Sequence, residues 1–87
     1  MWTVPKDEVA DLLRLDLLAK RREAREKAAL FEQTYGQSFE AFEETVQRGE
    51  EDVEQWDDYI EWKAYRRLRH EIEQKIDALG RGDFKVA

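Results

Sequence analysis

The sequence contains no cysteine, one proline, one histidine and four glycines. The lack of cysteine excludes disulfides, thiolate metal sites and thiol nucleophiles, and it is typical of proteins in a reducing compartment. So few glycines and prolines leave too few turn-forming residues for a many-stranded sandwich or barrel. We therefore expect the 87 residues to form one all-α domain held together by packing alone.

The N-terminal stretch also lacks a long apolar run. Asp7, Glu8, Asp11 and Asp16 interrupt its apolar residues, whereas a signal peptide or a spanning helix would need an uninterrupted apolar segment. We expect a cytoplasmic protein that does not associate with membranes.

Helix start and stop signals divide the chain into three segments. Pro5 is well placed as the first residue of a helix, and Gly36 and Gly80 are well placed to close helices. Ser38 is a good N-cap for a short helix between them. The sequence predicts a single domain, 1–87, with helices at about 5–35, 38–48 and 53–79 and a polar tail at 80–87. We expect the long helices to form an antiparallel hairpin joined by the short one, and two hairpins to form a dimeric helical bundle.

The dimer is predicted from the first half of the first helix. A stripe suited to the core begins with Val9, Leu13 and Leu17, but a second apolar set lies on the other side. That second set consists of Leu12, Leu15 and Leu18. A helix that is apolar on most of its circumference is buried on more than one side, so we expect these three leucines to mediate self-association in a homodimer.

The third helix carries four aromatic residues at every third position. They are Trp56, Tyr59, Trp62 and Tyr65. This spacing spirals around the helix over more surface than one neighbouring helix buries. Since Trp and Tyr commonly anchor interfaces, the spiral predicts a partner-binding surface. The alternative is that two of the four belong to the core and two are half-exposed.

A run of acids precedes and overlaps this spiral. The net charge is -6, and the acids concentrate between residues 40 and 58, with Arg48 as the only base. Six of these acids are the predicted partner-binding acids: Glu50, Glu51, Asp52, Glu54, Asp57 and Asp58. Charge complementarity predicts a small basic protein as partner. The alternative is a solvated surface whose charges pair with basic helix faces of the same domain.

Basic residues cluster in the first long helix, between Lys20 and Lys27. Such a cluster is one feature of a nucleic-acid-binding helix. Glu23 and Glu26 reduce its charge and are spaced to pair with its bases, so nucleic-acid binding is the least favoured interpretation.

No motif in the sequence predicts catalysis. The single His70 lies beside arginines, and the spacing from Arg66 does not match the Arg–His motif of small helical HEPN-type ribonucleases. The segment 49–58 lacks the ligand order of a calcium-binding EF-hand loop. The sequence also has no Gly-rich phosphate loop and no transition-metal ligand set. We expect a protein that is not an enzyme and that binds no metal or other cofactor.

Two segments resemble a family of small acidic helical proteins of prokaryotes that are regarded as antitoxin-like. Residues 30–43, LFEQTYGQSFEAFE, are similar to the family's "LFEKKYGMSFEEFE" run, and residues 56–65, WDDYIEWKAY, are similar to its "WDDYxEWxAY" segment. The resemblance covers about residues 5–79. It implies a chain encoded beside a small toxin, in some cases a ribonuclease-like one, that it neutralises by direct binding.

Two functions of different classes follow. The first is a toxin-neutralising interaction protein, whose acidic segment and aromatic residues cover the basic surface of a small nuclease toxin. The second is a structural or adaptor dimer built on the Leu12, Leu15 and Leu18 face. A small basic reading frame that overlaps this gene would favour the first function.

Overall fold

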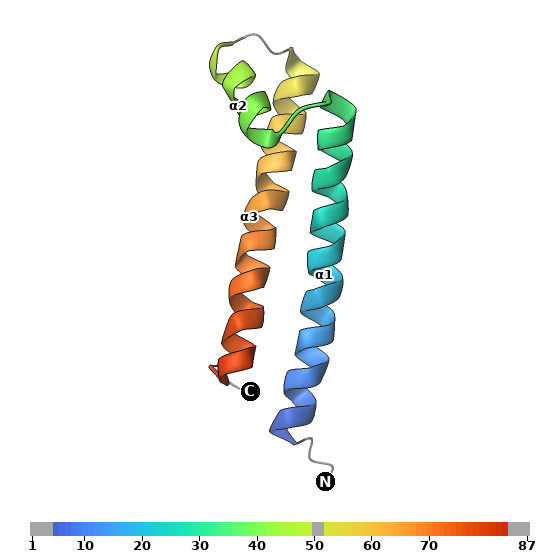
Figure 1. The fold of residues 1–87 in the computed structure, drawn as a ribbon, viewed down its shortest axis with the longest axis vertical. Helices are drawn as coiled ribbons and strands as arrows, with labels where there is room; N and C mark the ends of the chain where they lie inside the picture. Colours follow the sequence, from blue (N-terminus) through green and yellow to red (C-terminus); the bar gives the residue numbers. More distant parts are fainter. Residues whose placement is uncertain (1–4, 50–51, 84–87) are drawn as a thin grey trace.

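The computed structural model describes residues 5–49 and 52–83, and three helices account for most of them. Helix α1 spans Lys6–Tyr35, α2 spans Phe39–Gln47 and α3 spans Val53–Arg81. The two long helices run antiparallel and pack against each other, and α2 crosses the end at which they are connected (Figure 1). The prediction of an all-α hairpin with a short third helix is confirmed, and the described residues include no strand.

The boundaries of α1 follow from Pro5 and Gly36. Pro5 adopts an extended conformation and is the N-cap, one position before the helix rather than within it. Asp7 and Glu8 occupy the first turn, where the helix dipole favours negative charge. Gly36 has a left-handed φ of 63° and donates its N–H to the Glu32 carbonyl at 2.8 Å, which closes the helix as predicted.

Side-chain caps start the other two helices. The Ser38 hydroxyl accepts the Ala41 N–H at 3.2 Å at the start of α2. Asp52 and Gln55 form a capping box at the start of α3, with bonds of 2.8 and 3.1 Å. At its end α3 continues through Gly80, and Gly82, with a φ of 76°, is the closing residue. The prediction that Gly80 closes this helix was wrong by two positions.

The principal core lies at the connected end of the hairpin, under α2. It comprises the buried residues Phe39, Phe42, Val46, Tyr59 and Trp62, with Ala28, Phe31 and Tyr35 packed against them. Trp62 is 2% exposed, and its ring lies 5.7 Å from that of Phe42 and 5.8 Å from that of Phe31, measured between centroids. Aromatic rings from all three helices therefore meet around Trp62.

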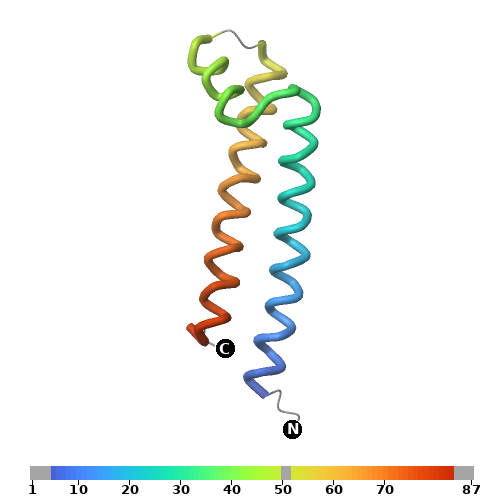
Figure 2. Tube along the Cα trace, viewed as in Figure 1, coloured from blue at the N-terminus to red at the C-terminus, as the bar shows by residue number. Residues whose placement is uncertain are grey.

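The opposite end, which carries both chain termini, has only two layers. The tube in Figure 2 shows that α2 covers the connected end alone. In this half the buried hydrophobic residues are Ala24, Ile72 and Leu79. Leu13, predicted for the core, is 40% exposed. The result is a slender molecule of 59 × 19 × 19 Å.

Candidate interaction surfaces

The predicted aromatic surface divides into two buried and two more exposed residues. Tyr59 and Trp62 are 8% and 2% exposed and belong to the core under α2. Trp56 is 45% exposed, and Tyr65 is half-buried. Tyr59 and Trp62 are therefore core residues rather than exposed anchors, as the alternative interpretation expected for two of the four, because α2 covers the side of α3 on which they lie.

Several acids of the acidic segment form hydrogen bonds within the domain. The Tyr59 hydroxyl donates to Glu43 at 2.7 Å, and the Tyr35 hydroxyl donates to the half-buried Asp58. Arg66 donates to Glu40 at 2.8 Å. Asp58 was predicted to face a partner, yet it helps to fix α1 against α3. Glu50 and Glu51, also predicted to bind the partner, lie outside the described residues.

The remaining acids surround an exposed apolar surface at the start of α3. We name this surface the acidic ridge and define it as Asp52, Val53, Glu54, Trp56 and Asp57. All five side chains are exposed, Val53 at 79% and Trp56 at 45%. Negative charges thus flank an apolar surface that no other described part of the chain covers. Three predicted acids and one predicted aromatic residue meet in this ridge.

The predicted self-association leucines are not equally accessible. Leu12 and Leu15 are 61% and 64% exposed, whereas Leu18 is half-buried. The structure also exposes large apolar residues that the sequence did not assign to an interface. Leu30 is 56% exposed, Ile60 50% and Leu68 43%. Exposed apolar surface therefore extends along much of the hairpin.

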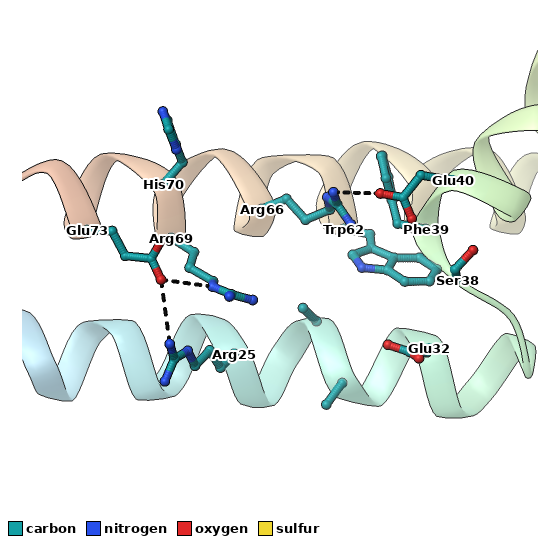
Figure 3. Close-up of a pocket in the computed structure, with 12 residues that line it drawn as sticks. Arg25, Glu32, Ser38, Phe39, Glu40, Trp62, Arg66, Arg69, His70 and Glu73 are labelled. Carbon is teal, nitrogen blue, oxygen red and sulfur yellow. Dashed lines mark hydrogen bonds and ion pairs between the residues drawn. The ribbon is translucent and has the colours of Figure 1, made fainter.

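A groove lies between α1 and α3, just below α2, and side chains of all three helices line it. It has a volume of about 450 Å³. Figure 3 shows Arg66 at its rim beside Phe39 and Glu40. The Arg66 guanidinium lies 4.4 Å from the centroid of the Phe39 ring, a cation–π geometry. Trp62 also lines the groove.

Ion pairs balance the charge of this groove. Glu73 lies 3.2 Å from Arg69 and 3.5 Å from Arg25, measured between side-chain oxygen and nitrogen. The hydrogen bond from Arg69 lowers the pKa of Glu73, and the charges of the neighbouring arginines add to this effect. The pKa of Glu40 is lowered first by its own backbone N–H and then by Arg66. The groove therefore offers no strong excess of either charge.

The sequence analysis did not predict this groove, although the spacing of four residues that line it is visible in the sequence of α3. Residues 62, 66, 69 and 73 follow the spacing of one helix edge, and all four line the groove. The contribution of Ser38 and Glu40 depends on how α2 docks, which the spacing within α3 does not reveal.

The basic segment of α1 is partly neutralised. Lys20 pairs with Asp16 at 2.9 Å, Arg22 with Glu26 at 3.4 Å, and Arg25 with Glu73 of α3 at 3.5 Å. Each pair neutralises a positive charge that would otherwise be available to contact a phosphate. Lys20 to Lys27 thus form a mixed-charge surface.

The described residues show no metal-binding cluster. His70 lines the edge of the groove but points away from α1 in Figure 3. No three His, Asp or Glu side chains in 5–49 and 52–83 are grouped so as to hold a metal ion. None of the three helices, as far as the structure describes them, is long and apolar enough to cross a membrane.

Comparisons with known proteins give no relative for this chain. No family model matches the sequence, and neither a curated protein nor a solved structure matches it.

Proposed function

We propose that this chain is a protein-binding module that docks a small basic protein on the acidic ridge, acting as the antitoxin of a toxin–antitoxin pair. The observation that carries the proposal is the exposure of Trp56 and Val53 among three exposed acids. The domain does not use these side chains for its own core. A partially exposed tryptophan in a charged rim resembles the anchors of protein interfaces.

The ridge has two components with separate roles. Its carboxylates attract and orient a cationic protein, which raises the association rate and makes that rate depend on salt. Its apolar residues lose water on docking, which supports affinity mainly through a slow dissociation rate. A basic, RNA-contacting surface on a ribonuclease-like toxin has the complementary charge, and its coverage would neutralise the toxin.

The apolar component is tested with Trp56→Ala. We expect this variant to bind the small basic protein encoded beside this gene at least tenfold more weakly, through faster dissociation, because a buried tryptophan anchor is worth about 2 kcal/mol or more. Leu15→Ala removes a comparably exposed residue from the other end of the hairpin and should leave binding unchanged. Equal effects of both variants, or failure of the two proteins to co-purify, would refute the proposal.

The charge component is tested by neutralising three carboxylates together: Asp52→Asn, Glu54→Gln and Asp57→Asn. Asparagine at 52 preserves the N-cap of α3, and Asp58 is left intact because it accepts a hydrogen bond from Tyr35. We expect slower association and a flatter salt dependence. Stopped-flow association rates at several salt concentrations measure both. An unchanged rate at low salt would exclude electrostatic docking on the ridge.

The second candidate function is a structural or adaptor dimer, favoured by the exposure of Leu12 and Leu15. It requires no toxin. Absence of a small basic gene neighbour, together with a stable dimer that recruits a different protein, would favour it over the antitoxin.

A further inference from the structure

The side of the hairpin opposite α2 exposes several apolar residues. The core residues Tyr59 and Trp62 mark the side of α3 on which α2 packs. Ile60, Ala64 and Leu68 are spaced by four residues, which places them roughly 180° around α3 from that side. All three are exposed.

Helix α1 contributes two leucines to the same side. Leu30 lies roughly 150° around α1 from Arg25 and Glu32, which line the groove below α2. Leu12 precedes Leu30 by 18 residues, or about five full helical turns, and so shares its orientation. We name this surface the bare face and define it as Leu12, Leu30, Ile60, Ala64 and Leu68.

We propose that a second copy of this chain covers the bare face, running antiparallel, with the two-fold axis close to Leu68. Helices bury an apolar face by packing against another layer. Two hairpins joined in this way form a four-helix bundle. This inference does not depend on the proposed toxin partner.

The heights of residues along the hairpin support this register. Arg25 contacts Glu73, Phe31 stacks on Trp62, and Leu17 and Leu79 line one hollow. Leu68 therefore lies near the middle of the molecule. A two-fold axis at that height brings the connected end of each copy to the terminal end of the other. The exposed Val53 of one copy then lies at the same height as Asp83 of the other copy. The exposed Leu13 lies beside Asp83.

Charge favours the antiparallel orientation over the parallel one. Glu61 precedes Leu68 by seven residues and Lys75 follows it by seven, so an axis at Leu68 brings the two to the same height in different copies. Both side chains are exposed, and both lie toward the bare face. Asp57 comes to the height of Asp16, whose charge Lys20 balances at 2.9 Å. In a parallel dimer each Glu61 would instead lie beside Glu61 of the other copy, and the two acidic ridges would lie beside each other.

The length of the hairpin allows an interface of standard size. One long side of a molecule of 59 × 19 × 19 Å is on the order of 1,000 Å², so a dimer that used most of that side would approach the roughly 800 Å² per partner of a standard protein interface. Trp56 lies nearer the outer edge of α3, away from the centre of this face. The dimer would thus leave the two Trp56 side chains exposed at opposite ends.

Mass measurements with matched aspartate variants test the interface. We expect the full chain to sediment as a dimer and Leu68→Asp to sediment as a folded monomer with unchanged helical circular dichroism. Leu15→Asp is the control, because Leu15 is 64% exposed but points away from α3 at the outer edge of α1. A monomeric wild type, or dissociation by Leu15→Asp but not by Leu68→Asp, would overturn the proposal.

Single-cysteine variants test the orientation, since the chain has no cysteine of its own. Leu68→Cys lies near the two-fold axis and should oxidise to a covalent dimer. Ile60→Cys should not, because an antiparallel arrangement separates its two copies by roughly 24 Å along the bundle. Equal cross-linking at both positions would show a parallel dimer and refute the orientation.

Charge reversal tests the register. Glu61→Lys should weaken dimerisation roughly tenfold, and adding Lys75→Glu should restore it, because the double variant exchanges the two charges of each pair. Sedimentation equilibrium of the two variants gives the dissociation constants. If the double variant is weaker still than Glu61→Lys, residues 61 and 75 do not meet and the register is wrong.

Discussion

The two ends of this hairpin are built from the same two helices but differ in how completely they are covered. At the connected end α2 adds a third layer, and Phe42 and Trp62 are only 1% and 2% exposed. At the terminal end no described segment takes that place, and Leu12 and Leu15 remain 61% and 64% exposed. Two long helices therefore bury one face of each other, and a third layer determines whether a second face is buried as well.

The largest effect is expected from Trp62→Ala. This substitution removes the ring around which aromatic residues of all three helices pack, and comparable deletions cost about 3–5 kcal/mol. Small domains have only about 5–15 kcal/mol in total, so we expect partial or complete unfolding. Urea denaturation followed by circular dichroism measures the loss.

Two further substitutions sharpen the contrast between the ends. Ile72→Ala deletes a side chain that is 3% exposed in the two-layered half, and we expect a loss near the lower limit for such deletions, about 2 kcal/mol. Trp56→Ala, at a 45% exposed site, should cost less than about 1 kcal/mol. If Ile72→Ala is as costly as Trp62→Ala, the connected end is not the main source of stability.

A smaller effect, with a distinctive pH dependence, is expected from Tyr35→Phe. Burial raises the pKa of the Tyr35 phenol above its ordinary value of 10.0, and the hydrogen bond to Asp58 raises it further. The unfolded chain loses this proton first, so the free energy of unfolding should fall as the pH rises above about 10. Below that pH the hydrogen bond is intact, and its removal should cost about 1–2 kcal/mol.

Denaturation at a series of pH values between 7 and 11 measures both effects. The difference in stability between wild type and Tyr35→Phe should shrink above about pH 10, since only the wild type depends on the Tyr35 proton. Asp58→Asn removes the carboxylate that accepts this hydrogen bond and should reduce the slope as well. Parallel stability curves for wild type and Tyr35→Phe would contradict this account.

A further small effect is expected at the N-cap of α2. Ser38→Ala removes the acceptor for the Ala41 N–H and should cost about 1 kcal/mol. Ser38→Asp supplies another capping oxygen, so its stability should remain close to that of the wild type. Thermal denaturation of the two variants isolates the contribution of the cap to the docking of α2. Equal losses in both would show that the cap does not stabilise α2.

Helix locations could be predicted from the sequence, because caps and helix-ending glycines act over a few residues. Ser38 and Gly36 have the predicted roles. Gly80 does not, because α3 continues to Arg81 and the residue with a left-handed φ is Gly82. Similarly, Leu13 has the spacing of a core residue yet remains 40% exposed, since a helical stripe is buried only where a neighbouring element lies against it.

The candidate site was only partly predictable for the same reason. The spacing of Tyr59 and Trp62 within α3 equally suits a surface or a core, and only the docking of α2 decides between them. Likewise, the sequence shows Asp58 as one acid in a cluster, and its hydrogen bond to Tyr35 appears only when α1 and α3 are side by side. Trp56 remains 45% exposed, because it lies on a different side of α3 from Trp62.

The slender shape has a consequence for hydrodynamic measurements. A single chain of 59 × 19 × 19 Å experiences more friction than a sphere of equal mass, so it leaves a gel-filtration column early, at the volume of a larger compact protein. Antiparallel pairing would thicken the molecule with little change in its length, so the dimer would elute only slightly earlier than the monomer. Elution volume therefore distinguishes the two states poorly, whereas light scattering, which reports mass independently of shape, separates them by a factor of two.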